Sequence, residues 1–474
     1  MNIASRALQI ATSIVLLIPI CGFKPNAAQN SRVAFGADFI VTAAPVYDLL
    51  AELRGQERFP SGAQLLLVHE GKSELLVKGF AATADACVSF DGTMVLFAGK
   101  QSASDLWQIW ELTVANRSVR KVIETPTDSE RPLYLPAGRM VWAERAPWGF
   151  QLKSAEDGHA PKAVPLNPTA GPGILPLTYT HSSAFPADVL ADGRILFEAG
   201  FPLGTGTTPE LFLVYADGSG LEAYRCDHGR ARWGGRQLAS GDVIFTHGTT
   251  LARFTSALAS EASVTAPRAE YGGAIAETAT GAWLVSARAT VGAHYEIELW
   301  KPGSTALQSI LAVSGQNLID PVLIAPRLTP NRHPSGLHDW NYANMLALDA
   351  RQSRVGDLKI APARVRLETM DTRGNAIVSG TAPVESDGSF FVKTPADKPI
   401  RFALLNAKGA VVRQEHGWFW IRRGEQRICV GCHTGPERAS ENRLPTVLLR
   451  TTTPVDLTGA ANASAEQQKS PGGN

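Results

Sequence analysis

The sequence has few cysteines, little net charge and no long hydrophobic run, and each shortage excludes a class of protein. Five cysteines in 474 residues are too few for a disulfide-rich scaffold. Acidic and basic residues nearly balance, with a net charge of +1, so composition gives no electrostatic basis for binding nucleic acid. An apolar run from Ile10 to Ile20 is shorter than the roughly 20 residues that cross a bilayer, so we expect no integral membrane span.

Common catalytic signatures are also missing. The chain contains no G-x-S-x-G elbow, P-loop, Rossmann fingerprint or H-E-x-x-H motif. Helical periodicity is hard to find, whereas two-residue alternation and β-branched runs are frequent. With 43 glycines and 30 prolines, the composition indicates many turns and few long helices, so we expect an all-β protein.

The first 28 residues have the pattern of an export signal. Arg6 supplies a positive region ahead of the apolar run, and small residues follow at Ala27-Ala28. A lipid anchor at Cys21 is disfavoured, because the bulky Ile20 precedes it where a lipobox has a small residue. We therefore predict a cleaved signal peptide at residues 1–28 and a periplasmic or otherwise exported protein.

Residues 34–325 repeat one unit, a strand, a glycine turn and a second strand. The turn glycines recur every 40 to 55 residues or so, which is the spacing of propeller blades: Gly92, Gly138, Gly193, Gly241 and Gly281. Each turn is typical of a hairpin within one blade. We predict a β-propeller with six blades, with seven as the alternative. A second type of turn, Asp217-Gly218-Ser219-Gly220, resembles an element of periplasmic propellers of the Tol-system type.

Few residues in the propeller region carry chemistry. Four histidines in predicted loops are candidates for the channel mouth: His181, His228, His247 and His294. Glu130-Arg131 precedes a predicted strand and is expected to orient a turn. Cys87 and Cys226 lie in apolar segments, where they either pair or, as we favour, remain buried free thiols.

A proline-rich strap, residues 326–344, separates the propeller from a second β unit. Proline favours extended, semi-rigid backbone, so the strap is expected to connect two domains without much flexibility. Short alternating strands then predict a small antiparallel β-sandwich-like domain over residues 345–458. Residues 459–474 are rich in Ala, Ser, Gln, Gly and Asn, which predicts a disordered tail.

The motif with the most specific chemistry is C-x-x-C-H at Cys429, Cys432 and His433. Two thiols at this spacing can each add to one vinyl group of a porphyrin, and the histidine then supplies an axial ligand to the iron. Zinc, a redox C-x-x-C and a structural disulfide are the alternatives. Zinc would need a second ligand pair, which the chain lacks, and an export signal suits covalent haem attachment. We therefore predict one covalent haem c.

The segment Val384 to Gly409 contains the elements D-G-S-F, P-A-D-x-P and R-F-x-L-L, and G-E-x-R-x-C-V-G-C-H follows. These elements resemble the haem-binding middle domain of the hydrazine synthase alpha subunit family, which also has a propeller before this domain. The resemblance implies the architecture and the haem cofactor. It does not imply hydrazine synthesis, because that family carries a further haem domain and this chain has a single C-x-x-C-H.

The sixth iron ligand decides between classes of function. His416 and Met370 are the candidate distal ligands, and His333 and His338 could reach the iron if the strap folds back. A bound distal ligand would indicate an electron-transfer cytochrome, with the propeller as docking platform for a redox partner protein. An open iron would indicate an enzyme acting on a small nitrogenous or oxygenated substrate. The third hypothesis is a propeller binding module whose haem is structural.

Overall fold

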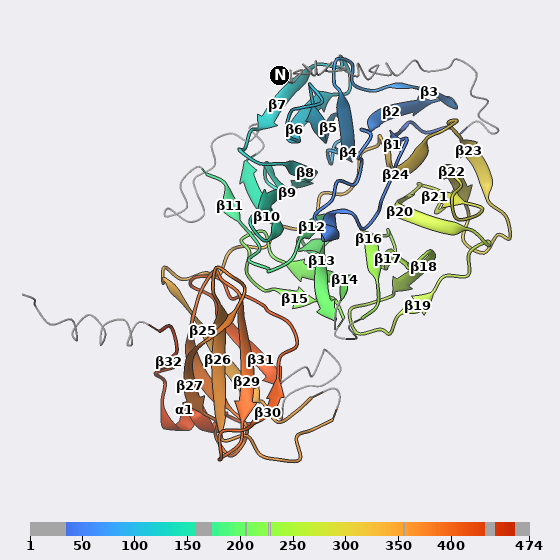
Figure 1. The fold of residues 1–474 in the computed structure, drawn as a ribbon. Helices are drawn as coiled ribbons and strands as arrows, with labels where there is room; N and C mark the ends of the chain where they lie inside the picture. Colours follow the sequence, from blue (N-terminus) through green and yellow to red (C-terminus); the bar gives the residue numbers. More distant parts are fainter. Residues whose placement is uncertain are drawn as a thin grey trace, which may run out of the picture.

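A computed structural model describes residues 35–156, 173–203, 206–225, 227, 229–353, 356–431 and 441–459. In these residues the strands form eight four-stranded sheets. Six sheets are arranged around a common centre, and the other two face each other in a separate unit (Figure 1). The prediction of an all-β propeller followed by a small β-sandwich-like domain is confirmed.

The propeller strands run in chain order from β1 to β24, with one sheet per blade. Listed from the inner to the outer edge, the first two blades are β24 (Asn317–Leu323), β1 (Phe39–Ala44), β2 (Gln64–His69), β3 (Lys72–Leu75), and then β4 (Ala82–Val88), β5 (Met94–Lys100), β6 (Gln108–Thr113), β7 (Val119–Ile123). The next two are β8 (Ser129–Leu135), β9 (Arg139–Ala146), β10 (Gly149–Glu156), β11 (Leu175–Pro176), and then β12 (Ala184–Val189), β13 (Ile195–Leu203), β14 (Gly206–Val214), β15 (Glu222–Ala223). The last two are β16 (Arg232–Gln237), β17 (Val243–His247), β18 (Thr250–Phe254), β19 (Ala262–Ser263), and then β20 (Glu270–Glu277), β21 (Trp283–Arg288), β22 (Glu296–Trp300), β23 (Gln308–Leu311).

The ring closes by joining the two ends of the propeller region in one blade. β24, the last propeller strand, pairs antiparallel with β1, the first, so that Ala43 lies opposite Leu318. Apolar side chains from both strands, including Phe39 and Val41, are fully buried in one cluster with those of the preceding blade. Six blades are therefore complete within the described residues, as the glycine spacing predicted.

The strap runs across the glycine turns that the sequence singled out. The Asn331 amide donates a hydrogen bond to the carbonyl of Ala191 (2.9 Å). A Cβ on Gly193 would lie 2.1 Å from the Asn331 carbonyl oxygen, and one on Gly92 would lie 3.0 Å from the backbone nitrogen of Pro326. These two turns need glycine both for their positive φ and because the strap backbone lies against them.

The connection from β1 to β2 fills the middle of the ring and contains the short helix η1 (Glu52–Arg54), drawn in blue near the centre of Figure 1. The guanidinium of Arg131, from inner strand β8, donates to Glu52 Oε2 at 2.6 Å. Arg58 pairs with Asp85 of β4. We call residues 45–63 the plug. The expectation that Glu130-Arg131 orients a turn is wrong, because both residues lie within β8 and Arg131 binds the plug.

The second unit consists of two sheets packed face to face. One sheet has the order β31 (Gln426–Gly431), β25 (Tyr342–Asp349), β28 (Phe390–Pro395), β32 (Val455–Asp456), and the other has the order β27 (Ala376–Pro383), β26 (Arg364–Met370), β29 (Ile400–Leu405), β30 (Val411–Gln414). A short helix, α1 (Thr446–Arg450), precedes β32. Alternate apolar residues such as Val365, Leu367 and Val392 are fully buried between the sheets.

Two strands of the sandwich add a feature that the sequence did not indicate. β31 pairs parallel with β25, and β32 pairs parallel with β28, whereas the other pairings of the sandwich are antiparallel. β31 contains Cys429, so the first cysteine of C-x-x-C-H lies on an edge strand of a sheet.

Neither helix in the described residues has the length and apolar character needed to cross a membrane.

Candidate functional site: the C-x-x-C-H strand and its supports

Cys429 lies in the middle of β31, opposite Ala347 of β25. Its side chain is half-buried against the sandwich core and forms no disulfide. The next side chain, Ile428, points to the other face and is 64% exposed. The first thiol is therefore fixed in place by the sheet but remains partly accessible, as a covalent attachment point requires.

The surroundings of Cys429 favour the neutral thiol. Burial raises its pKa, the nearby Arg427 guanidinium opposes this shift, and the Glu415 carboxylate adds to it. Arg427 lies two residues earlier and thus on the same face of β31. Its Nη2 donates to the Leu221 carbonyl of the propeller. Its Nη1 is buried without a hydrogen-bond partner in the described residues and forms a longer ion pair with Glu425 Oε1 at 3.7 Å.

An unpartnered, buried guanidinium nitrogen beside a free thiol fits a covalently attached haem. The thiol could form the thioether, and Arg427 Nη1 could donate a hydrogen bond to a propionate oxygen, because carboxylates are the preferred partners of guanidinium groups. Cys432 and His433 lie outside the described residues. Within those residues, no group of three or more His, Cys, Asp or Glu side chains is arranged to hold a metal ion.

The chain enters and leaves the segment 432–440 at two fixed points. At the entry, Gly431 lies opposite Asp349, the last residue of β25. The Asp349 carboxylate is bound by Arg351 through Nε (2.8 Å) and Nη2 (2.7 Å), and Arg351 Nη1 reaches the Ser386 carbonyl at 3.0 Å. This paired geometry fixes the end of β25 and with it the end of β31.

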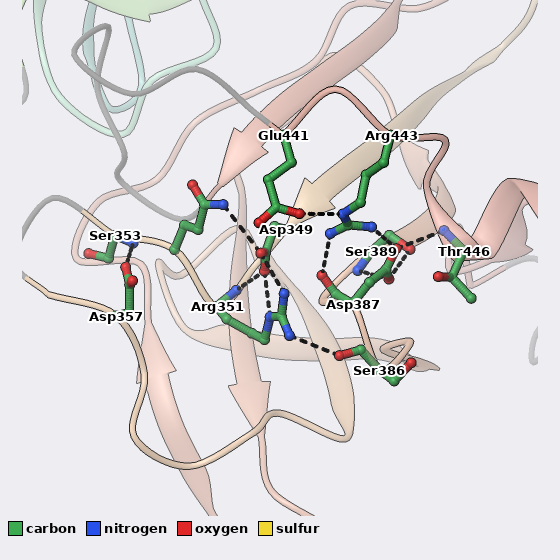
Figure 2. Close-up of polar contacts among 11 residues, drawn as sticks. Asp349, Arg351, Ser353, Asp357, Ser386, Asp387, Ser389, Glu441, Arg443 and Thr446 are labelled. Carbon is green, nitrogen blue, oxygen red and sulfur yellow. Dashed lines mark hydrogen bonds and ion pairs between the residues drawn. The ribbon is translucent and has the colours of Figure 1, made fainter.

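At the exit, Arg443 binds the turn that contains D-G-S-F (Figure 2). Its guanidinium pairs with the Asp387 carboxylate and donates to the Asp387 carbonyl at 3.1 Å. The Thr446 amide donates to Asp387 Oδ2 (2.8 Å), and the Val447 amide donates to Ser389 Oγ (3.1 Å). We call these contacts the Asp387 clamp. The D-G-S-F element therefore holds the chain just after the haem motif.

The Asp387 clamp predicts an acid-sensitive contribution to stability. Burial alone would raise the pKa of Asp387, but hydrogen bonds from Ser389 and Thr446 lower it well below its usual range. This stabilisation is present above the unfolded pKa of about 3.9 and is lost as the pH falls towards the folded value. We expect Asp387→Asn to lower the free energy of unfolding by about 2 kcal/mol at pH 7. Urea titrations at pH 7 and pH 3 should show this difference shrinking at the lower pH.

Glu441 offers a matched control, since it also pairs with Arg443 (2.8 Å) but is 67% exposed. Glu441→Gln should change the free energy of unfolding by less than about 1 kcal/mol. Equal losses in the two variants, or a loss in Asp387→Asn that is independent of pH, would contradict the assignment of the clamp to Asp387.

The segment before β31 is docked on the propeller. Trp420 is 2% exposed and packs within the propeller core, with ring centroids 6.3 Å from Tyr179 and 6.5 Å from Phe197. Its Nε1 donates to the Gly218 carbonyl (3.2 Å). Trp420 therefore contributes to core packing between the two units.

The same turn receives two charged residues. Arg422 is 6% exposed and donates from Nε to the Asp217 carbonyl at 3.0 Å, while Nη1 binds Asp397 Oδ1 at 2.6 Å. Glu425 accepts from the amides of Gly220 (3.3 Å) and Arg422 (2.8 Å). The turn Asp217–Gly220 is therefore the contact through which the propeller positions the strand of Cys429. The Arg422 guanidinium is committed to this interface.

Two of the candidate distal imidazoles already have partners. The ring of His333 stacks on Tyr215 of the propeller, with centroids 3.8 Å apart. His338 lies 2.8 Å from Gln426 Nε2 and stacks on Trp340 at 4.3 Å. His416 is exposed, in the segment between β30 and β31. Met370 ends β26, in the sheet opposite the one that contains β31.

The histidines expected at the channel mouth are dispersed. The ring of His181 lies tilted against Trp148, with centroids 4.8 Å apart, His247 Nδ1 lies 2.5 Å from Glu261 Oε1, and His294 is exposed. His228 and Cys226 lie outside the described residues. Cys87 is buried and free, as favoured. The sequence did not indicate the arginines and carboxylates of the channel, because Glu130-Arg131 was expected to precede a strand and in the structure lies within β8.

Fold and site together define a six-bladed propeller that supports a β-sandwich domain with an accessible cysteine on its edge strand. Residues 348–434 match the hydrazine synthase alpha subunit middle domain family. Hydrazine synthase subunit alpha of Kuenenia stuttgartiensis is 28% identical over 95 residues, which are 18% of this chain and 12% of that protein. Residues 348–434 are thus a domain of this family, as the motifs predicted.

Comparison of structures extends the likeness to the propeller. The structure of Kuenenia stuttgartiensis hydrazine synthase matches with a TM-score of 0.74 and 17% identity, covering 89% of this chain and 72% of that chain. TolB from Acinetobacter baumannii matches with a TM-score of 0.45 and 10% identity, over 62% of this chain and 68% of that chain. The first match establishes a shared fold for both units. The sequence match spans about an eighth of the length of the curated relative. The activity of that protein is therefore not transferred to this chain.

Proposed function

We propose that this protein is an exported monohaem c-type redox protein. One haem is attached through Cys429 and Cys432, with His433 as an axial ligand of the iron. The observation that carries the proposal is the partly accessible Cys429 thiol, free of a disulfide, beside Arg427 Nη1, which has no hydrogen-bond partner among the described residues. The haem would supply one-electron chemistry when bound.

The residues of the chain itself support a redox centre with a fixed position. The Asp387 clamp and the β25–β31 pairing hold both ends of the segment that contains Cys432 and His433. Trp420 and Arg422 fix the preceding segment on the propeller. A rigid surround limits the reorganisation around a redox group, and the propeller offers a broad surface for a redox partner protein.

A second candidate is catalysis at an open iron on a small nitrogenous or oxygenated substrate. The specific observation is that His333 and His338 are engaged by Tyr215 and Gln426. These two imidazoles would then not be available as a second ligand of a bound haem iron. Likeness to hydrazine synthase is consistent with this candidate, whose substrate would be a small nitrogen compound.

The absorption spectrum tests both candidates. The protein should be produced in a host that matures c-type cytochromes, reduced with dithionite, and measured before and after addition of carbon monoxide. Sharp α and β bands that do not change on addition of carbon monoxide would support electron transfer with two strong axial ligands. A spectrum that shifts with carbon monoxide would support the open iron. If no haem bands appear, the proposed haem function is wrong.

A further inference from the structure

The inner strands of the propeller share an irregularity that encircles the channel. In all six inner strands of the described residues, the pairing with a neighbouring strand shifts register at one point. In five of them a residue at this shift has a positive φ: Asp85, Arg131, Gly234, Gly273 and Asp320. For a residue with a side chain this conformation costs roughly 1–2 kcal/mol, and such strain is concentrated at ligand sites.

These register shifts surround a cavity of about 60 Å³ next to the plug. Tyr47 and Arg58 of the plug contribute to its lining, together with Trp233 and Arg236 of β16. A cavity of this volume admits several water molecules or one group of a few heavy atoms. It therefore suits a small polar ligand and excludes a large cofactor.

The carboxylates that line the cavity are already satisfied. They are Asp85, Glu198 and Asp320. Each accepts one hydrogen bond from the guanidinium of Arg58 or Arg131 and another from a backbone N–H. A cationic ligand would have to displace these hydrogen bonds to reach the carboxylates. The acceptor groups of the cavity therefore do not favour binding of a cation.

The donors, in contrast, remain without partners. Tyr47 Oη and Trp233 Nε1 are buried and have no hydrogen-bond partner in the described residues. Burial, reinforced by Asp320, raises the pKa of Tyr47 well above its usual value, so the phenol keeps its proton and can donate. Arg236 lines the cavity, and within the described part of the chain its guanidinium has neither a hydrogen bond nor an ion pair. Each buried, unmatched donor costs about 1–3 kcal/mol, which a ligand with acceptor atoms would recover.

We propose that the channel cavity binds a small monocarboxylate, whose negative charge pairs with Arg236 and whose oxygen atoms accept from Tyr47 and Trp233. A carboxylate matches the site because it offers about four lone-pair positions and no donor. Arg58 and Arg131 are already committed to the surrounding carboxylates, including Glu52 of the plug. These carboxylates outnumber the guanidinium groups, and their negative charge opposes binding of an anion. The Kd for the monocarboxylate is therefore expected to be on the order of millimolar.

Binding of acetate to the purified full-length protein tests the proposal. Thermal unfolding should be followed while sodium acetate replaces sodium chloride at constant ionic strength, with acetamide as the uncharged ligand of similar shape. We expect saturable stabilisation by acetate, because a ligand that binds only the folded state raises the unfolding temperature. Equal stabilisation by acetamide would overturn the carboxylate assignment, and no saturable effect of acetate would show that the cavity holds water only.

Two variants locate the site. Arg236→Gln should raise the Kd for acetate about tenfold or more, because a charged hydrogen bond is lost. Tyr47→Phe removes an unpaired hydroxyl, so it should weaken binding without lowering the unfolding temperature of the acetate-free protein. As a matched control, Arg253→Gln in the same blade alters an exposed arginine paired with Asp242 and should bind acetate like the wild type. If Arg236→Gln and Tyr47→Phe both retain wild-type affinity, the ligand does not bind in this cavity.

Discussion

Serine at both Cys429 and Cys432 is expected to abolish covalent haem completely. Thioether formation needs the sulfur atoms, and serine leaves the shape of β31 almost unchanged. The measurement is haem staining after denaturing electrophoresis, combined with the intact mass of the purified protein. The single Cys429→Ser variant should retain only the attachment through Cys432, with a shifted α band.

Cys87→Ser is the matched control for this experiment. Cys87 is also a free thiol, but it is buried in the propeller, 6% exposed, on the inner strand β4. Its replacement should leave the haem stain unchanged. Persistent covalent haem in the double variant, or equal loss in Cys87→Ser, would contradict attachment at the C-x-x-C-H motif.

Arg58→Met is expected to cause a large loss of stability in the propeller. Arg58 is 5% exposed and faces the carboxylates of Asp85, Asp320 and Glu52. Burial alone would lower its pKa, yet these carboxylates raise it well above its usual value, so the guanidinium is charged in the folded protein. Removing one partner leaves buried carboxylates without compensation, at a cost of about 3–5 kcal/mol in the free energy of unfolding. Equilibrium urea unfolding measures this loss.

Arg54 provides the control within the same plug. It pairs with Asp48, but both side chains are nearly half exposed. Arg54→Met should therefore change the free energy of unfolding by less than about 1 kcal/mol. A similar small change for Arg58→Met would mean that the channel network contributes little, and that the plug is held mainly by apolar contacts such as those of Phe59.

The propeller could be predicted from sequence because its blades depend on local patterns. Glycines such as Gly92 and Gly193 mark hairpins whose positive φ few other residues adopt easily, and the alternating strands beside them are short-range features. The parallel pairing of β31 with β25 could not be predicted. It joins residues about 80 positions apart, and nothing in the sequence of β31 distinguishes a parallel partner from an antiparallel one.

The candidate site was predictable to a similar, limited extent. C-x-x-C-H made Cys429 a candidate because covalent haem attachment would dictate the spacing of the motif itself. The roles of Trp420 and Arg422 were not accessible, since both depend on a turn about 200 residues earlier that becomes their neighbour only in the fold. The same holds for the D-G-S-F element. It is recognisable as a turn, but its function of holding Arg443 depends on a tertiary contact.

The pairing of β24 with β1 has a consequence for how the chain is made. Synthesis proceeds from the amino terminus, so β1 is available long before β24, and the ring cannot close until Leu318 can pair with Ala43. Until then β1 has an unpaired edge that can associate with other chains. Contacts between such distant residues also slow folding. Newly made protein should therefore depend on chaperones for most of the time that the propeller needs to emerge.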